Sequence, residues 1–238
     1  MLDLAIGYES PVLLEQATQL AGQLQLPIDN NAPNQLFFSA QGLKLCISPF
    51  LPLQADFNRD SWLKRRNEGK KQGLVRACKP TSGMRIVDAT AGWGRDAAIL
   101  ASFGATVQMI ERNPVMAALL SDALLNRDVS SPLLDVSLIQ QNALNYFEQL
   151  QPDNYPDVIY IDPMHPERQK SSLVKKDMQI LQQLIGADND AMCLLDMARQ
   201  RVKQRVVVKW PQQLASLAKP SASIEGKTIR FDIYTPRN

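Results

Sequence analysis

The segment from Ile86 to Asp96 constrains the fold of this chain more than any other. An apolar run that ends in Asp88 is followed by Gly92 and Gly94, and a helical pattern then covers residues 95–103. Glycine lets the backbone turn tightly and approach a ligand without interference from a side chain. The helix that follows points its partly positive N-terminus at the same place. The segment therefore predicts a strand, a glycine turn and a helix that together hold a nucleotide-containing cofactor, with both glycines in contact with it.

Two cofactors fit such a turn. The residues Gly92, Gly94 and Ala97 satisfy the loose dinucleotide pattern Gly-x-Gly-x-x-Ala, and Glu111 lies near the distance at which an acidic residue would hold an adenosine ribose. Asp88 instead favours S-adenosylmethionine, because a carboxylate at the strand end can reach the amino-acid part of the methionine moiety. A dinucleotide site normally carries no charge at that position. We therefore predict S-adenosylmethionine as the cofactor, with Glu111 accepting both ribose hydroxyls.

A second motif closes another apolar strand, over residues 160–166. Its sequence includes Asp162-Pro163-Met164-His165, and an acidic residue followed by proline at such a place is typical of methyltransferases that modify amino groups. Asp162 and a backbone carbonyl of Pro163 or Met164 would accept hydrogen bonds from the target amino group, and the carboxylate could accept the released proton. His165 would stack on a flipped base, donate or accept a hydrogen bond at the edge of that base, or lie in a solvated loop. The motif predicts the catalytic end of the cofactor site.

Beyond residue 80 the sequence alternates short apolar strands with helical stretches. Strands are expected at 85–89, 106–111, 136–140, 157–162 and 205–209, and helices at 95–103, 114–126, 143–150, 173–185 and 190–202. Such alternation implies a parallel sheet covered on both faces. Residues 222–225 and 228–234 predict a hairpin, so the last strand would run antiparallel, and Asp232 would pair with a nearby cation. We predict an α/β fold of the Rossmann-like class I methyltransferase type, with a mostly parallel seven-stranded sheet.

Residues 1–80 differ from this pattern and are expected to form a small N-terminal α+β lobe beside a methyltransferase domain at 81–238. An amphipathic helix is predicted at 12–24, and a hairpin pairs residues 35–39 with 43–48. A lobe of this size could cap the cofactor domain and grip the substrate.

Composition narrows the class of protein. With 238 residues, of which 45% are hydrophobic, the chain can bury one large core with a small appendage. No apolar run approaches the roughly 20 residues needed to cross a bilayer, and residues 1–4 lack a signal pattern, so we expect a cytoplasmic protein without a membrane partner. Cys46, Cys78 and Cys193 lack the spacing of a metal site and are expected as reduced thiols. His165 is the only histidine, and no metal is expected.

Basic residues concentrate in one stretch of the chain. Residues 59–79 carry a local charge of +6, whereas the rest of the chain carries about −4. Solvated helix faces are the ordinary explanation of such a run, but a nucleic acid delivered to the site must be held by its backbone. We therefore predict phosphate contacts from this run, from a second run after the Asp162-Pro163 motif, and from one strand-end lysine: Lys64, Arg65, Arg66, Lys70, Lys71, Lys175, Lys176 and Lys209.

Six blocks of the sequence resemble one family of RNA-modifying enzymes. They are residues 88–96, 111–115, 162–166, 173–176, 206–209 and 230–234, and their order and spacing are similar to those of the family ribosomal RNA small subunit methyltransferase J. The resemblance covers about residues 54–234. It implies methyl transfer to N2 of a guanine in 16S ribosomal RNA, free or within the small subunit. It also implies a cofactor pocket lined by Arg95, Asp96, Glu111, Arg112 and Asp162, with the next contact at Asn142 and Ala143.

Three other functions fit parts of the sequence. The Asp162-Pro163 motif would also serve methylation of adenine N6 or of a protein amide. A noncatalytic RNA-binding factor for ribosome assembly could keep the same fold, although the presence of Asp88, Glu111 and Asp162 argues against a decayed site. An NAD-linked reductase is the more distant alternative.

Overall fold

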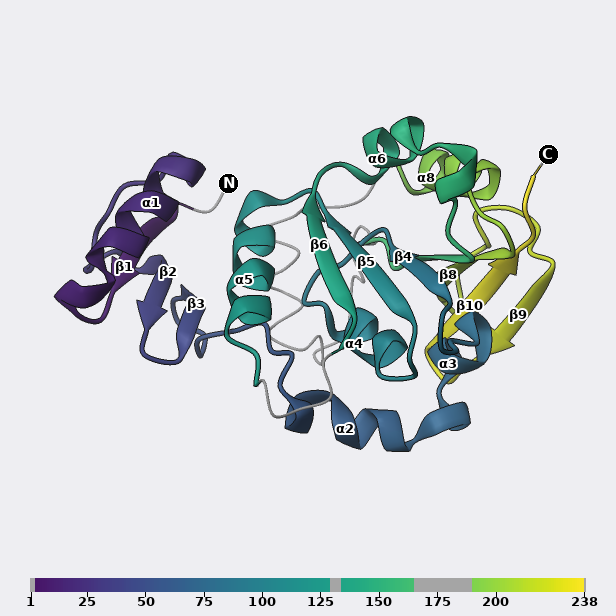
Figure 1. Cartoon of the computed structure of the whole chain (residues 1–238), viewed down its shortest axis with the longest axis horizontal. Coiled ribbons are helices and arrows are strands. Elements are labelled where there is room, and N and C mark those ends of the chain that lie inside the picture. The colour runs from purple at the N-terminus through teal and green to yellow at the C-terminus, as the bar shows by residue number, and fades with distance from the viewer. Residues whose placement is uncertain (1–2, 129–133, 165–189, 238) are drawn as a thin grey trace.

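A seven-stranded sheet forms the centre of the computed structural model, which describes residues 3–128, 134–164 and 190–237 (Figure 1). The strand order is β6-β5-β4-β7-β8-β10-β9. The first five of these strands are parallel, and β10 runs antiparallel to both β8 and β9. The strands are β4 (Arg85–Asp88), β5 (Thr106–Glu111), β6 (Val136–Gln140), β7 (Val158–Ile161), β8 (Arg205–Pro211), β9 (Ala222–Glu225) and β10 (Ile229–Tyr234). The predicted fold class, including its antiparallel C-terminal hairpin, is confirmed.

Helices cover both faces of this sheet, which explains why its strands are apolar on both sides. Alternate residues of each strand point into different cores. Ile86 and Val207 pack into the core with α3, α4 and α5, and Val87 and Val206 into the core with α6 and α8. In Figure 1, α6 and α8 lie together on one side of the sheet. The helices are α3 (Gly73–Cys78), α4 (Arg95–Ala101), α5 (Pro114–Leu125), α6 (Ala143–Gln149) and α8 (Ala191–Gln200). The predicted helix at 173–185 lies outside the described residues.

The N-terminal part of the chain forms a separate three-stranded sheet with one helix against it. The elements are β1 (Ala5–Tyr8), α1 (Leu14–Leu24), β2 (Asn34–Ser39) and β3 (Gly42–Ile47). The predicted hairpin of β2 and β3 is confirmed, whereas β1, which pairs parallel to β2, was not predicted. The small sheet contacts the larger part of the chain through helix α5, where the Leu43 N–H of β3 donates to Asp122 Oδ2 at 2.8 Å. The division of the chain at residue 80 stays a prediction.

The basic run at 59–79 forms two helices, which the sequence analysis did not assign. Helix α2 (Arg59–Asn67) lies beside α4, and α3 packs on β10. The buried Trp62 anchors α2. A Cβ on Gly73, the first residue of α3, would lie 2.5 Å from a ring atom of Phe231. Only glycine allows α3 to approach β10 this closely, so these helices are fixed against the site that the sheet builds.

Across the described parts of the chain, no helix combines the length and apolar character that a membrane span needs.

Candidate active site

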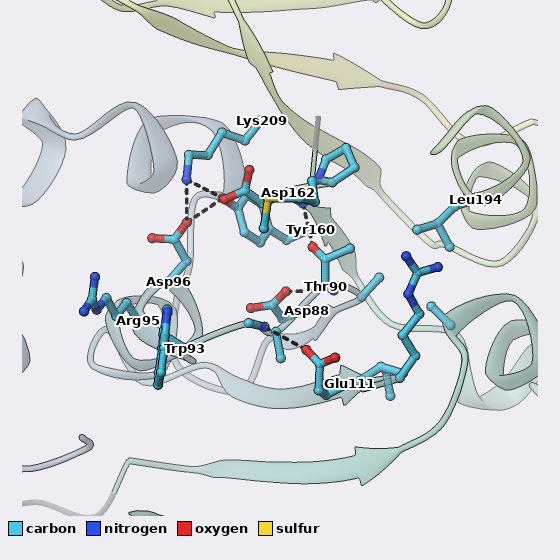
Figure 2. A pocket seen from close by; sticks show the side chains of 18 of the residues that line it. Asp88, Thr90, Trp93, Arg95, Asp96, Glu111, Tyr160, Asp162, Leu194 and Lys209 are labelled. Carbon is cyan, nitrogen blue, oxygen red and sulfur yellow. Dashed lines mark hydrogen bonds and ion pairs between the residues drawn. The ribbon is translucent and has the colours of Figure 1, made fainter. Parts of the chain in front are cut away.

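The carboxyl ends of the parallel strands meet at one cavity of about 540 Å³ (Figure 2). Strand β4 ends in Asp88 and β5 in Glu111, Asp162 directly follows β7, and Lys209 lies in β8. Ligands of open α/β sheets bind at this edge, where loops from neighbouring strands converge. A volume of this size falls within the range of small-molecule sites. The structure thus brings the two motifs of the sequence together in one pocket.

The glycine turn has the geometry that the sequence predicted. Gly92 and Gly94 have positive φ angles of 53° and 70°, which other residues adopt only with strain. Gly92 lines the cavity, but Gly94 does not. A Cβ on Gly94 would lie 2.5 Å from Phe57, so this glycine is needed for packing at the start of α4. Its predicted contact with the cofactor stays a prediction.

Glu111 joins the end of β5 to the glycine turn. One carboxylate oxygen accepts a hydrogen bond from the Gly92 N–H at 3.0 Å, and the other accepts one from the Asn113 N–H at 2.8 Å. Its side chain is buried but lines the cavity. These two backbone contacts orient the Glu111 carboxylate at the wall of the cavity, where it can act only as an acceptor.

Asp88 lies on the floor of the cavity and is almost completely buried. One of its oxygens accepts a hydrogen bond from the Thr90 N–H at 3.2 Å. Burial first, and then the negative charge of Asp96, raise the pKa of Asp88 to about 8. At neutral pH this carboxyl is mostly protonated, and a cation placed beside it would favour the charged form.

A network of charges connects the glycine turn with the Asp162 loop. The Lys209 Nζ lies 2.5 Å from Asp162 Oδ2 and 3.5 Å from Asp96 Oδ2. Arg65 on α2 contacts the other oxygen of Asp96 at 2.6 Å, and the Tyr160 hydroxyl donates to Asp96 at 2.5 Å. In Figure 2 the ammonium group of Lys209 points between the two carboxylates. The network fixes five side chains, which come from α2, α4, β7, the loop after β7, and β8.

Electrostatics keep this network ionised. Burial would raise the pKa of Asp96, but the charges of Lys209 and Arg65 outweigh burial and lower it to about 2. Burial would likewise lower the pKa of Lys209, but Asp96 and Asp162 outweigh it and raise that pKa above its ordinary value. Both groups therefore stay charged across the physiological pH range.

Asp162 is positioned by its backbone as well as by Lys209. Its N–H donates to the Thr90 Oγ1 at 2.7 Å, which fixes the loop after β7 to the loop after β4. The Asp162 side chain is 35% exposed, so a substrate in the cavity can reach it. Pro163 and Met164 line the same cavity. His165, predicted as a fourth member of this group, lies outside the described residues.

The far end of the cavity is built by the loops after β5 and β6. Asn142 caps α6, with its side-chain oxygen accepting from the Leu144 N–H at 2.8 Å, and Ala143 follows it. Arg112 forms an ion pair with Asp190 at 3.2 Å. The predicted cofactor-binding residues that line the cavity are Asp88, Gly92, Arg95, Asp96, Glu111, Arg112, Asn142, Ala143 and Asp162.

The described residues that were predicted to contact RNA phosphates differ in whether their side chains already have partners within the protein. Lys64 and Lys71 are exposed, and Lys70 belongs to the short turn Gly69–Lys71. Three others have partners within the protein: Arg65 and Lys209 contact Asp96, and Arg66 donates to the Ser102 carbonyl at 2.9 Å. Lys175 and Lys176 lie outside the described residues.

The cavity residues that the sequence analysis missed include Thr90, Tyr160, Ile229 and Phe231. Tyr160 belongs to a predicted strand, and the alternation of buried side chains could have shown which core it faces. The contact of Thr90 with Asp162 spans 72 positions, and no local pattern reveals it. The same is true of Phe231, which reaches the cavity because β10 pairs it with Lys209.

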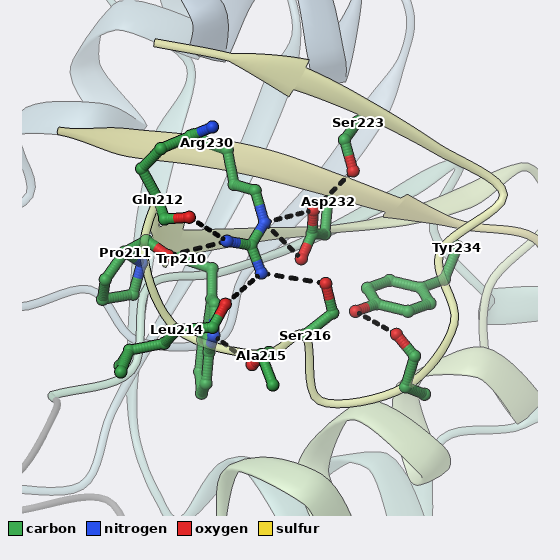
Figure 3. Close-up of polar contacts among 11 residues, drawn as sticks. Trp210, Pro211, Gln212, Leu214, Ala215, Ser216, Ser223, Arg230, Asp232 and Tyr234 are labelled. Atoms are coloured by element: carbon green, nitrogen blue, oxygen red, sulfur yellow. Dashed lines mark hydrogen bonds and ion pairs between the residues drawn. The ribbon is translucent and has the colours of Figure 1, made fainter. Parts of the chain in front are cut away.

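A buried arginine holds the strands behind the cavity together (Figure 3). The guanidinium of Arg230 donates to the carboxylate of Asp232, to the Ser216 hydroxyl and to three backbone carbonyls at the end of β8 and in the loop after it. Asp232 is completely buried and also accepts from the Ser223 hydroxyl at 2.6 Å. The prediction that Asp232 pairs with a cation of the hairpin is confirmed, and the network fixes β10 beside Lys209.

Comparisons with known proteins identify the family. The family described as "Putative SAM-dependent methyltransferase" matches residues 19–236. Proteins named ribosomal RNA small subunit methyltransferase J are similar over almost the whole chain. One from Legionella pneumophila (strain Lens) is 58% identical, covering 98% of this chain and 96% of the relative. One from Nitrosococcus oceani is 42% identical and covers 98% of this chain and 99% of the relative.

A solved structure agrees with these relatives. The SAM-dependent methyltransferase from Neisseria gonorrhoeae has a TM-score of 0.74 at 28% identity, covering 98% of this chain and 96% of that chain. S-adenosylmethionine is therefore the cofactor, and the dinucleotide alternative is not supported. Because the family match spans residues 19–236 and the relatives match end to end, this chain is a SAM-dependent methyltransferase and belongs to the family of ribosomal RNA small subunit methyltransferase J.

Proposed function

We propose that this protein transfers a methyl group from S-adenosylmethionine to the exocyclic N2 of a guanine in 16S ribosomal RNA. The observation that carries the proposal is the position of Asp162. Its partly exposed carboxylate and the adjoining Pro163 and Met164 line the same cavity as Asp88 and Glu111. An acceptor for an amino group thus lies beside the groups that suit a cofactor carrying a ribose and a positive charge.

The residues of the cavity fit S-adenosylmethionine. Glu111 would accept the ribose hydroxyls, since the Gly92 and Asn113 N–H groups already orient it. Asp88 would attract the positively charged methionine end, and Asn142 and Ala143 would line the adenine end. Arg95, Asp96 and Arg112 complete the proposed pocket wall. When bound, S-adenosylmethionine supplies an electrophilic methyl group on a sulfonium.

The task of the protein's own residues is chiefly to position the nucleophile. Guanine N2 is a poor nucleophile because its lone pair is delocalised into the ring. Hydrogen bonds from the amino group to Asp162 and to a carbonyl of the Pro163-Met164 segment would favour a pyramidal nitrogen aimed at the methyl carbon. The Asp162 carboxylate would then accept the released proton. Pro163 restricts the loop and so limits the entropy that is lost on binding.

The RNA would approach across the basic face of α2 and the turn that follows it. Lys64, Lys70 and Lys71 are the proposed phosphate contacts there, with Lys175 and Lys176 of the second basic run. Arg65 and Arg66 already have protein partners, and Lys209 lies inside the cavity beside Asp162, so we leave these three out of the proposed phosphate contacts. Since its proposed substrate is ribosomal, we place the protein in the cytoplasm.

The direct test uses 16S ribosomal RNA from cells with and without this protein. Deletion is expected to remove a single N2-methylguanosine from the digested RNA, and purified protein with S-adenosylmethionine is expected to restore it. Free RNA and small subunits assayed side by side identify the preferred substrate. Unchanged N2-methylguanosine would contradict the proposal, and a lost N6-methyladenosine would point to the adenine alternative.

Reversing Lys64 and Lys71 to glutamate is expected to weaken RNA binding and to flatten its salt dependence. Each lost phosphate contact lowers the slope of log affinity against log salt by about 0.7–0.9. Cofactor affinity should not change. The matched control reverses Lys203 and Lys219, which are exposed and precede β8 and β9 at the opposite edge of the sheet. Equal slopes for the two double variants would show that Lys64 and Lys71 do not contact RNA.

A further inference from the structure

The ammonium group of Lys209 is held in the cavity beside the proposed amino-group acceptor. It lies 2.5 Å from Asp162 Oδ2 and 3.5 Å from Asp96 Oδ2. Asp96 is itself held by Arg65 and Tyr160, so Lys209 has a fixed position rather than a free range of rotamers. An ammonium group has three N–H donors. Within the described parts of the chain, two of these N–H groups can point to the carboxylates of Asp162 and Asp96. The third N–H group can then donate to a ligand.

The edge of a guanine presents a donor and acceptor pattern that matches this pair. The N2 amino group and N1–H are donors, and O6 beside them is an acceptor. Asp162 offers acceptors only and Lys209 donors only. We propose that Lys209 donates a hydrogen bond to O6 of the target guanine while Asp162 accepts from its N2 and N1, so that the two residues together select the base. This inference rests on the proposed function.

The same pair disfavours adenine. Adenine carries an amino group at position 6, where guanine has O6, and its N1 is an acceptor. Lys209 would then face a donor, and Asp162 would face a lone pair. Leaving a charged group without its partner costs more than the contact itself gains. Lys209 and Asp162 therefore favour guanine through matched hydrogen bonds and disfavour adenine through mismatched donors and acceptors.

The neighbours of Lys209 support a role at the base rather than at the RNA backbone. Its side chain is 27% exposed and lines the cavity with Ile229, Phe231 and Met164. Strand pairing places Phe231 directly opposite Lys209. Apolar walls around a lysine and an aspartate suit a flat base read at its edge. The positive charge of Lys209 is retained because Asp96 and Asp162 both favour it.

The test compares two bases on two proteins. RNA fragments carry either guanine or 2-aminopurine at the target position. The second base keeps the amino group but lacks O6 and the N1 proton. The quantity measured is the ratio of kcat/KM for guanine to that for 2-aminopurine. This ratio is expected to fall by about tenfold to a hundredfold in Lys209→Met, the contribution of one charge-assisted hydrogen bond. Loss of the N1 proton affects both proteins alike and cancels.

Two further variants separate base selection from structural support. Arg65→Met removes the other cation at Asp96 and is expected to leave the ratio near that of the unaltered protein. Lys209→Arg keeps a charged donor and is expected to retain most of the discrimination. If Lys209→Met is too slow to assay, competition between the two RNAs for binding gives the ratio of their affinities, which is expected to fall in the same direction.

The outcomes are distinguishable. A Lys209→Met protein that loses the same factor on both bases, with the ratio unchanged, would overturn the inference and leave Lys209 a support for Asp162. Failure of the unaltered protein to methylate guanine N2 would instead overturn the proposed function. Thermal unfolding and cofactor affinity of each variant establish that the fold is intact before the ratios are compared.

Discussion

Asp162→Ala is expected to slow single-turnover methyl transfer by about a hundredfold or more while the protein remains folded. An oriented, charge-assisted hydrogen bond to the target amino group contributes on the order of a few kcal/mol. The side chain is 35% exposed, so its removal leaves no buried cavity. The measurement is transfer in one turnover with cofactor and RNA both saturating, because those conditions separate chemistry from binding.

Two controls make this result specific. Asp153→Ala removes an exposed carboxylate from the short turn Pro152–Asn154 and should leave transfer unchanged. Asp162→Asn keeps one acceptor oxygen and should lose less than the alanine variant. A folded Asp162→Ala protein with near-normal transfer would eliminate Asp162 as the amino-group acceptor and would transfer that role to the carbonyls of the same loop.

Arg230→Met is expected to lower the free energy of unfolding by about 3–5 kcal/mol, the cost of breaking a buried ion pair from one side. The substitution leaves the buried Asp232 carboxylate without its cation and three backbone carbonyls without their donor. In urea unfolding, the effect is expected as a lower midpoint concentration of urea, with an unchanged slope of the free energy of unfolding against urea concentration.

The matched control is Arg237→Met, which breaks the ion pair of Arg237 with Asp196 at 3.2 Å, where the two side chains are 59% and 44% exposed. An exposed pair is worth about 0–1 kcal/mol, so the two losses should differ severalfold. The double substitution Arg230→Met with Asp232→Leu should recover part of the loss, because no unpaired charge then remains. Equal effects at Arg230 and Arg237 would show that the buried network is not needed for stability.

The sheet could be predicted from the sequence because its strands carry a strong local signal. Val206-Val207-Val208 is buried on both faces, and such runs are typical of central parallel strands. Strand β1 was missed because Ala5–Tyr8 is only four residues long and includes a glycine. Helix α2 was missed because Trp62 is its only buried residue, and one apolar residue gives no helical periodicity.

The site was predictable where a residue lies at a strand end and less so where a contact crosses the chain. Asp88, Glu111 and Asp162 each follow a recognisable apolar run, so their convergence follows from the parallel sheet. Lys209 was assigned to RNA phosphate from its charge. Its contact with Asp162 spans 47 positions, and only the tertiary structure shows that this charge lies inside the cavity.

In the proposed binding mode, the buried carboxyl of Asp88 would give up its proton when the positively charged cofactor binds beside it. With a pKa of about 8, this group holds its proton at neutral pH until a positive charge arrives beside it. Seating the methionine end of S-adenosylmethionine there, as proposed, would lower that pKa and release the proton to solvent. Affinity for the cofactor would therefore rise with pH up to about 8 and level off above it. The product, S-adenosylhomocysteine, keeps the α-ammonium group but lacks the sulfonium charge, so it would stabilise the deprotonated carboxyl less and dissociate more readily in mildly acidic solution.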